Sequence, residues 1–543
     1  MTDTRASVPV PVNEPVRGYA PGSPERAALT SALESMMSSE VEIPLRIGGE
    51  KVTTGRMGDC QAPHDHGHLL GHYHKASAEQ VSQAIEAARN AHADWSRMPW
   101  QSRAAVFLKA ADLLATTYRD ALNGSTMLGQ SKTVFQAEID AACELIDFFR
   151  YNTHYLQQIY GEQPGSQPGM WNYVDHRPLE GFVFAVTPFN FTSIAGNLPT
   201  APALMGNTVL WKPASSSVYS GHFIMELLEA AGLPPGVINF VPGSGAAVGD
   251  PALDSPELAG IHFTGSTATF QGMWARVGAN IQNYRGYPRI VGETGGKNFV
   301  FAHPSADPEG LVTALVRGAF EYQGQKCSAA SRAFIPASLW DETLERLEAE
   351  VKQIDTGSPL DFKNFMCAVI DKTAFDSITG YIDYANESSD HEVRIGGDYD
   401  DATGYFISPC VVVADSPHSR LMTEEIFGPV LTLWRYEDKK IDEALATCDS
   451  ASPYALTGAI FCRDRRSVVE LSDKLRFAAG NFYINDKPTG AVVGQQPFGG
   501  GRASGTNDKA GSVLNLVRWV SPRSVKETFV PPTDFRYPHM GSE

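Results

Sequence analysis

Short apolar runs separated by helix-length segments are the feature of this 543-residue chain that most constrains its fold. The runs occupy 181–187 (GFVFAVT), 207–211 (NTVLW), 237–241 (VINFV) and 260–264 (GIHFT), and a helix-like segment of about 217–231 lies between two of them. A strand without polar alternation is typically buried on both faces, as in a parallel sheet, and parallel strands need crossover helices. The pattern therefore predicts a doubly wound, mostly parallel α/β sheet.

A second alternating stretch begins after residue 296. Residues 298–302 (NFVFA) precede a helix-like segment at about 311–322, and further apolar runs lie at 332–335, 411–413 and 430–434. Because a chain of this length exceeds what one hydrophobic core usually serves, we expect two α/β lobes.

Helices dominate the first third of the chain. Ser77 and Gln80 form a capping-box pair ahead of an apolar stripe, which predicts a helix start. One helix is predicted over about 134–156. Near the other end, residues 513–529 read as an extended segment whose edge would need covering.

Charge and cysteine usage exclude several classes of protein. The net charge of −18 disfavours nucleic acid and anionic lipid as partners, and no apolar run of about 18 residues is present to span a membrane. Seven scattered cysteines without a CxxC pair argue against a disulfide framework and a zinc cluster, and favour a reducing compartment. We therefore expect no bound metal.

The N-terminal residues 1–24 are rich in Pro, Val and Ser. They lack the basic start and apolar core of a secretory signal, and they carry too little Arg for a mitochondrial presequence. We interpret them as the arm of a cytoplasmic protein, lying on another part of the molecule.

Three segments carry residues suited to acyl chemistry. Cys327 lies among small and polar residues in GQKCS (324–328), as an accessible nucleophilic thiol would. Glu293 precedes two glycines of ETGGK (293–297) that let a base move, and Asn190 ends TPFN (187–190), where its amide could donate to an oxyanion. Alone, each has an ordinary interpretation: a buried small side chain, a solvated turn or an Asx turn.

Together with WKPA (211–214), FTGS (263–266) and EIFGPV (425–430), these motifs resemble the aldehyde dehydrogenase superfamily over nearly the whole chain. The resemblance implies that Cys327 is the nucleophile and that Glu293 is the base that releases the acid from a thioester. Asn190 and the backbone N–H of Cys327 would form the oxyanion hole. The implied fold has two doubly wound parallel-sheet lobes and a small β oligomerisation extension.

The resemblance also implies a nicotinamide dinucleotide, with Lys212 at the adenosine ribose, Glu425 at the nicotinamide ribose and Phe427 packing nearby. A helix N-terminus would face the pyrophosphate, where free N–H groups favour anions. Its residues are Gly265, Ser266, Thr267, Ala268 and Thr269. Ser215, three positions after Lys212, is neutral and does not repel a 2′-phosphate, so NADP stays open while NAD is expected.

The stretch 489–500 (TGAVVGQQPFGG), with FRYN at 149–152 and ASGTNDK at 503–509, is similar to the 1-pyrroline-5-carboxylate dehydrogenase branch. That branch oxidises L-glutamate 5-semialdehyde to L-glutamate, the second step of proline breakdown. The implied substrate contacts are Ser328 and the backbone of Gly490 and Ala491 at the carboxylate, Phe191 and Phe498 around the methylene chain, and Lys326, Thr187 and Glu144 nearby. Some members of the branch have Ser in place of Ala491.

The same resemblance implies a dinucleotide-binding domain made of residues 1–165, 180–296 and 487–512. It implies a catalytic domain at 297–486. Residues 166–179 and 513–543 form the oligomerisation extension. We expect a homodimer in which the Trp171–His176 segment and the C-terminal strand pair across subunits, while larger oligomers and coupling to a proline dehydrogenase stay open. The alternatives are another semialdehyde, transfer of the acyl group to coenzyme A, or a non-catalytic protein with this fold.

Overall fold

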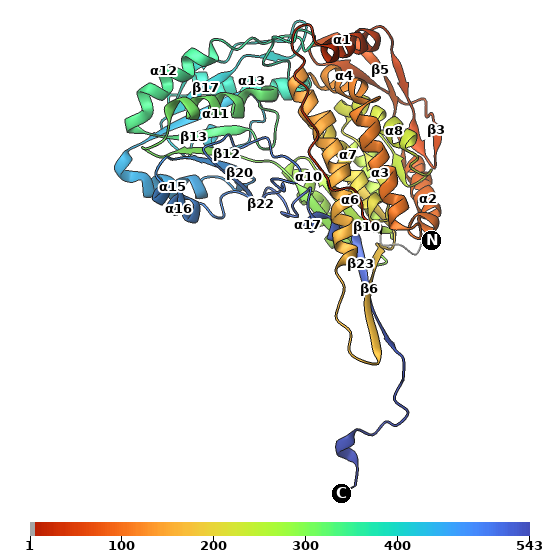
Figure 1. Cartoon of the computed structure of the whole chain (residues 1–543). Helices are drawn as coiled ribbons and strands as arrows, with labels where there is room; N and C mark the ends of the chain where they lie inside the picture. Colours follow the sequence, from red (N-terminus) through yellow and green to blue (C-terminus); the bar gives the residue numbers. More distant parts are fainter. Residues whose placement is uncertain (1–5, 543) are drawn as a thin grey trace.

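The structure, a computed structural model, describes residues 6–542 and contains two seven-stranded sheets, one in each of two lobes that lie side by side (Figure 1). The first sheet has the order β11 (Arg289–Glu293), β10 (Leu258–Thr264), β7 (Phe182–Val186), β8 (Thr208–Lys212), β9 (Ile238–Phe240), β2 (Leu45–Ile47) and β3 (Glu50–Val52). The first five strands are parallel, and β2 and β3 add an antiparallel edge. The apolar runs of the sequence therefore form the predicted buried parallel sheet.

The strand order indicates at which edge of this sheet a ligand would bind. Strand β7 pairs with β8 on one side and with β10 on the other, so the direction of winding reverses at β7. Ligands of open α/β sheets bind beyond the carboxyl ends of the strands at such a reversal. The segments that leave β7 and β10 there carry Asn190 and Ser266.

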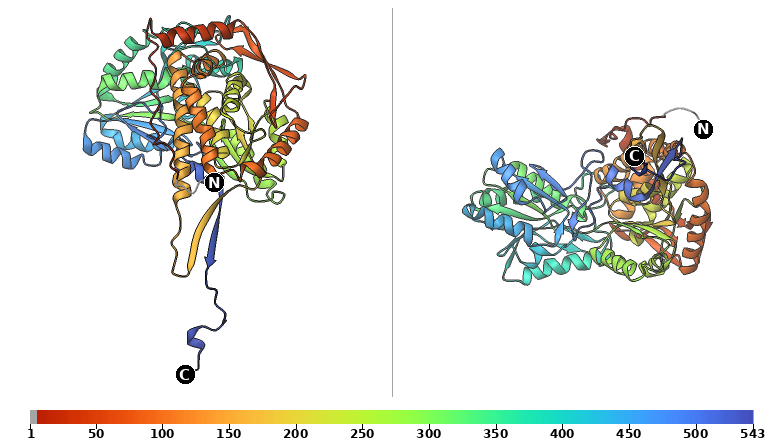
Figure 2. Two further views of the ribbon diagram at one scale, coloured as in Figure 1. Left: turned by 45° about the vertical axis from the view of Figure 1, so that its right-hand side comes forward. Right: turned by 90° about the horizontal axis from the view of Figure 1, so that it is seen from below.

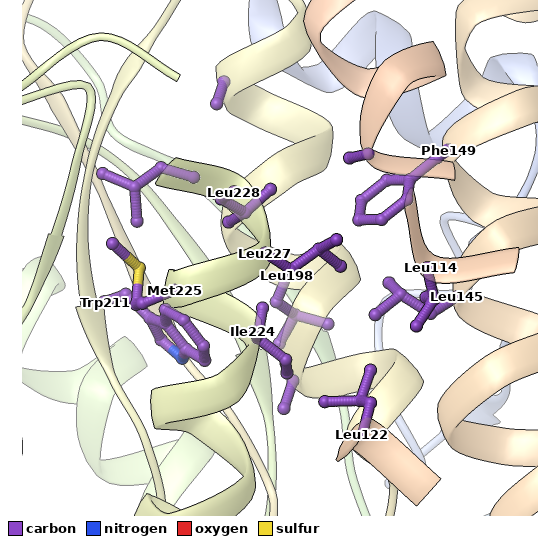
Figure 3. Close-up of a cluster of buried hydrophobic side chains, with 14 of the residues drawn as sticks. Leu114, Leu122, Leu145, Phe149, Leu198, Trp211, Ile224, Met225, Leu227 and Leu228 are labelled. Carbon is purple, nitrogen blue, oxygen red and sulfur yellow. The ribbon is translucent and has the colours of Figure 1, made fainter. Parts of the chain in front are cut away.

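Helices cover both faces of the first sheet and enclose two apolar clusters. One face carries α3 (Trp100–Ala115), α6 (Leu145–Gly161), α7 (Thr192–Leu204) and α8 (Val218–Ala231), and the other carries α2 (Ala78–Trp95), α9 (Gly245–Asp254) and α10 (Thr267–Ala279). Figure 3 shows side chains of the first cluster converging, among them Leu114, Leu145, Leu198 and Leu227. Burial of each such side chain stabilises the folded protein by about 1.5–3 kcal/mol. The packed helices and sheet in turn support the loops at the sheet edge.

The second lobe repeats this plan. Its sheet has the order β14 (His391–Gly396), β17 (Cys410–Ala414), β18 (Val430–Tyr436), β13 (Ala330–Pro336), β12 (Asn298–Ala302), β20 (Thr457–Phe461) and β21 (Asn481–Ile484), with only β14 antiparallel to its neighbour. Helices α11 (Pro308–Phe320) and α12 (Trp340–Val351) pack on one face, and α15 (Ile441–Ser450) and α16 (Arg465–Lys474) pack on the other. Helix α13 (Lys372–Glu387) packs near β17.

Strands β6 (Met170–Pro178) and β23 (Val520–Thr528) form a ribbon that extends away from both lobes (Figure 2). They pair antiparallel within one chain along their whole length, so the expectation that these two segments pair with each other across subunits is wrong. Residues 513–519 were also expected to be extended, but they form helix α17 (Val513–Leu516) and a 3₁₀ turn at Val517–Trp519. The Ser512 hydroxyl caps α17 by accepting the N–H of Leu514.

The predicted helix over 134–156 is divided. Helix α5 (Val134–Ala137) runs into a π-helical segment at Glu138–Glu144 before α6 begins at Leu145. The buried carboxylates of this segment pair with Arg119 and Lys132 of the preceding chain. Widened helical turns of this kind occur frequently at functional sites.

Further elements of the first lobe are α1 (Pro24–Met37), α4 (Arg119–Gln130) and a small sheet of β1 (Val41–Ile43), β5 (Asp65–His74) and β4 (Met57–Ala62). Within residues 6–542, none of the helices combines the length and apolar character that crossing a bilayer would need.

Candidate active site

A strained turn presents Cys327. The residues before it, Tyr322, Gln323 and Gly324, have φ angles of 52°, 54° and 66°, which is left-handed backbone that non-glycine residues adopt only at a cost. The Gln323 amide holds the turn, because its Nε2 donates to the carbonyls of Ser131 at 3.1 Å and Ala368 at 2.7 Å. These buried bonds fix the position of the thiol.

Glu293 ends β11 and lies next to this thiol. The Sγ of Cys327 donates to Oε1 of Glu293 across 3.7 Å. Burial raises the pKa of Glu293 to about 8, although the thiol and the charge of Lys509 oppose the shift. Burial, with the charges of Glu293 and Glu425, also raises the pKa of Cys327 well above its usual value. The pair therefore consists of a protonated thiol and a carboxylate whose pKa lies near neutral pH, where a general base is most effective.

Asn190 approaches the nucleophile from the other lobe. Its side chain is buried, and Nδ2 donates to the carbonyl of Gln325 at 2.9 Å, two residues before Cys327. A primary amide carries two N–H groups, so the second can donate a hydrogen bond to the oxyanion of a carbon that has become bonded to the sulfur. The structure thus brings together the three residues that the sequence nominated for acyl chemistry.

Lys212 and the start of α10 lie at the carboxyl ends of β8 and β10. Burial lowers the pKa of Lys212 to about 8, and its Nζ donates to the carbonyl of Pro213 at 3.2 Å, which leaves further N–H groups for a ligand. The Ser266 hydroxyl caps α10 by accepting the N–H of Thr269 at 3.3 Å. Gly265, Thr267 and Ala268 complete this helix start.

Glu425 and Phe427 lie between the lobes. Oε1 of Glu425 accepts the N–H of Gly296 at 2.8 Å, and a Cβ at Gly295 would stand 2.2 Å from Oε2, so residue 295 must be glycine for the carboxylate to sit here. Phe427 has a φ of 58° and packs edge-on against Phe189 with 5.9 Å between ring centroids. A buried cation, a helix N-terminus and a carboxylate match the hydroxyl and phosphate groups of a dinucleotide.

A cavity of about 440 Å³ opens beside the sulfur. The predicted substrate residues that line it are Phe191, Lys326, Ser328, Gly490, Ala491 and Phe498, together with Glu144 and Cys327 itself. Thr187 is not in the lining, because its Oγ1 turns to accept the indole N–H of Trp211 at 3.0 Å. The structure therefore gathers the predicted substrate residues with that one exception.

Charged and polar groups are unevenly placed around the cavity. Lys326 pairs with Glu321 at 3.1 Å, and the hydroxyls of Ser328 and Thr489 are 2.7 Å apart. Lys487, which sequence reasoning missed, reaches the same loop: its Nζ lies 3.5 Å from where a Cβ of Gly490 would be. These lysines and hydroxyls are groups that can donate to an anionic end of a ligand. Burial raises the pKa of Glu144 to about 8, with the charge of Asp140 adding to the effect.

Two further features escaped the sequence analysis. Lys132 is fully buried, lies 2.6 Å from Asp140 and places its Nζ 4.4 Å from the ring centroid of Phe191. A cation behind an aromatic ring fixes that ring as a cavity wall. Residues of the N-terminal segment, Asn13 and Glu14 among them, also line the cavity. No local pattern signals either contact, because the partners are far apart in sequence.

Comparisons with known proteins agree with this geometry. A sequence model of the Aldehyde dehydrogenase family matches residues 52–523. The mitochondrial delta-1-pyrroline-5-carboxylate dehydrogenase of Dictyostelium discoideum is 52% identical over 539 residues, which are 99% of this chain and 97% of the relative. The human mitochondrial enzyme of the same name is 48% identical over 529 residues, 97% of this chain and 94% of the relative.

Solved structures are also similar. The delta-pyrroline-5-carboxylate dehydrogenase of Mycobacterium tuberculosis bound with NAD has a TM-score of 0.96 and 55% identity, with complete coverage of both chains. Proline utilization A from Bdellovibrio bacteriovorus has a TM-score of 0.91 and 32% identity over 96% of this chain and 53% of its own.

The relatives overturn the expectation of a cytoplasmic protein. Those from Dictyostelium discoideum, Bos taurus and Homo sapiens are all named as mitochondrial. The expectation rested on the composition of residues 1–24, but the described part of that segment is bonded to the body of the protein through Asn13, Glu14 and Arg17. The composition of the segment was therefore no guide to location.

Proposed function

Because the chain belongs to the aldehyde dehydrogenase family, we propose that it oxidises L-glutamate 5-semialdehyde, the open form of 1-pyrroline-5-carboxylate, to L-glutamate with NAD. This is the second step of proline catabolism. The observation that carries the proposal is the cavity, whose lining includes both the nucleophile Cys327 and the proposed carboxylate-binding residues Ser328, Gly490 and Ala491. A substrate with an aldehyde at one end and a carboxylate at the other fits both.

The first chemical step uses the pair formed by Cys327 and Glu293. Glu293 takes the thiol proton across 3.7 Å, and the sulfur forms a bond to the aldehyde carbon. The carbonyl oxygen becomes an oxyanion that accepts N–H groups from Asn190 and the Cys327 backbone. When bound, NAD supplies the acceptor for the hydride that leaves this carbon. The acyl group is then held on Cys327 as a thioester.

The second step releases the acid. Glu293 first releases the thiol proton to solvent and then takes a proton from water, whose oxygen forms a bond to the thioester carbon. The carbon–sulfur bond breaks, the leaving sulfur takes that proton back from Glu293, and the acid and the Cys327 thiol are freed. A base buried next to the sulfur suits both steps, because burial makes it strong enough to remove the proton. The retained base argues against transfer of the acyl group to coenzyme A.

We assign the dinucleotide to the groups that face it at the sheet edge. Lys212 would hold the adenosine ribose, the helix start at residues 265–269 the pyrophosphate, and Glu425 the nicotinamide ribose, with Phe427 packing nearby. The NAD-bound relative supports NAD as the cofactor. Ser215 leaves NADP as a weaker alternative.

We assign binding of the substrate to residues of the cavity wall. Ser328 and the N–H groups of Gly490 and Ala491 would bind the carboxylate, and Lys326 would add positive charge. Phe191 and Phe498 would enclose the methylene chain. Apolar walls with a few placed polar groups are typical of small-molecule sites.

A substrate panel tests the proposed function. The purified protein is mixed with NAD and either 1-pyrroline-5-carboxylate or butyraldehyde, and NADH is followed by absorbance. We expect kcat/KM for the pyrroline to exceed that for butyraldehyde by at least about 100-fold, because a bound charged group is worth several kcal/mol in specificity. Equal or lower values would refute the assignment. Addition of coenzyme A tests the alternative, since an acyl-coenzyme A product would replace glutamate.

We also propose the domain division expected from the sequence: dinucleotide binding by 1–165, 180–296 and 487–512, catalysis by 297–486, and assembly by 166–179 and 513–543. The exposed side chains of Trp171 and Phe529 on the ribbon support a homodimer through this extension. Sedimentation of the double variant Trp171→Asp, Phe529→Asp should give a smaller species than the wild type. The proline utilization A relative supports functional coupling to a proline dehydrogenase.

A further inference from the structure

The N-terminal arm, residues 8–19, forms part of the cavity wall although it has no regular secondary structure. The carboxylates of Glu14, Glu138 and Asp147 hold it in place. Glu14 pairs with Arg119 at 2.6 Å and with Arg150 at 2.8 Å, and the Tyr19 hydroxyl donates to Glu138 at 2.9 Å. An irregular segment stays in one place only when such bonds offset its conformational entropy, so the arm is a fixed part of the structure.

Asn13 is the residue of the arm that reaches the substrate loop, residues 489–500. Its Nδ2 donates to Asp147 and to the carbonyl of Val493, both at 2.8 Å. Its Oδ1 accepts from the Tyr151 hydroxyl at 3.2 Å and from Nε2 of Gln495 at 3.0 Å. Both N–H groups and both acceptor positions of the amide are therefore used. One side chain joins the arm, helix α6 and the substrate loop.

The substrate loop depends on such a tether. Gly490 and Gly494 have φ angles of 91° and 82°, a left-handed backbone region that glycine enters easily. Because glycine restricts its own backbone little, the loop needs contacts from elsewhere to hold its shape. At Gly494 it lies against the Tyr151 ring, where a Cβ would stand 2.1 Å from a ring carbon. Val493, bonded to Asn13, is two residues beyond Ala491. The bond to Asn13 thus restrains the backbone next to Gly490 and Ala491, which line the cavity.

We propose that Asn13 is a positioning residue for the substrate's carboxylate and that Asn13, Glu14 and Val16 of the N-terminal arm are part of the substrate site. The inference rests on the proposed function, because it concerns the same loop. An amide is needed here: a carboxylate at residue 13 could not donate to Asp147 and the Val493 carbonyl. Loss of the tether weakens carboxylate binding and leaves the sulfur chemistry intact.

The test compares Asn13→Ala with Val10→Ala, which changes an exposed side chain of the same arm. For each, KM and kcat are measured with 1-pyrroline-5-carboxylate and with butyraldehyde, and hydrogen exchange is followed over residues 489–496. For Asn13→Ala we expect KM for the pyrroline to rise about tenfold, since several hydrogen bonds are lost. The kcat for butyraldehyde should stay within about twofold, and exchange in the loop should become faster. Val10→Ala should match the wild type.

An unchanged KM for the pyrroline in an active Asn13→Ala variant would overturn the inference, as would an equal rise in KM for both aldehydes. If Asn13→Ala does not fold, Gln495→Ala removes one of the same bonds from the loop side. It should raise KM for the pyrroline about threefold, and an unchanged KM would again overturn the inference. Failure of the proposed function is a different result, since the wild type would then show no preference for the pyrroline.

Discussion

The carboxylate of Glu293 lies 3.7 Å from the sulfur of Cys327, although the two residues are 34 positions apart in the chain. The distance lets one group act twice, first on the thiol and then on the water that attacks the thioester. Burial supports this dual use, because it raises the pKa of Glu293 to about 8 and keeps the resting sulfur protonated.

Glu293→Gln should separate the two steps. The amide keeps the shape of the side chain but accepts no proton, so release of the acid should slow by about 10²–10⁴-fold. Solvent bases can still remove a thiol proton, and acylation should therefore slow less. Stopped-flow absorbance should show a burst of about one NADH per site followed by slow turnover. A variant with wild-type steady-state turnover would contradict the assignment of the base.

The pH dependence of kcat/KM should report the same carboxylate. Glu293 acts as a base only when deprotonated, and its raised pKa of about 8 means that the active form is lost as the pH falls below 8. We expect kcat/KM to reach a plateau above pH 8 and to fall about tenfold per pH unit on the acid side. The same profile in Glu293→Gln would show that another group is responsible.

Ala491→Ser should tighten substrate binding. Ala491 lines the cavity at the proposed carboxylate loop and offers only its backbone N–H. A serine hydroxyl adds a donor to a charged group, so KM for the pyrroline should fall about threefold to tenfold. The KM for butyraldehyde, which has no carboxylate, is the control and should not change. A fall in both values would mean that the hydroxyl acts on something other than the carboxylate.

Gly295→Ala should weaken NAD binding by displacing Glu425. The added Cβ would lie 2.2 Å from the Glu425 carboxylate, and overpacking of this kind costs about 1–3 kcal/mol. Calorimetry with NAD should therefore show a Kd at least about tenfold higher. Gly249→Ala is a matched control, because an added Cβ there meets no atom within 4 Å. Equal affinities for the two variants would remove Glu425 from the proposed cofactor site.

Local patterns in the sequence were enough to predict much of the fold. The capping box of Ser77 and Gln80 is present, and the apolar runs became the parallel strands. These features depend on neighbours in the chain, and the sequence displays them directly. Residues 513–519 show the limit: the alternation of Leu516, Arg518 and Val520 suggested a strand, whereas the cap from Ser512 starts a helical turn and the strand begins only at Val520.

Site residues that belong to a local sequence motif were predictable. Site residues that depend on contacts between distant segments were not. Cys327, Glu293 and Asn190 lie in recognisable motifs, and the structure brings them to one place. Lys132 and Asn13 give no such signal, because their partners Phe191 and Val493 lie 59 and 480 positions away. Thr187 lies outside the cavity lining for the same kind of reason, since only the folded chain brings Trp211 to its hydroxyl.

Mass spectrometry of the trapped acyl-enzyme tests the central claim most directly. Glu293→Gln is mixed with 1-pyrroline-5-carboxylate and NAD, quenched in acid during the burst and digested. We predict that the peptide containing Cys327, and no other cysteine peptide, gains the mass of a glutamyl group. NADH formation with an unmodified Cys327, or with the group on another of the seven cysteines, would contradict the account.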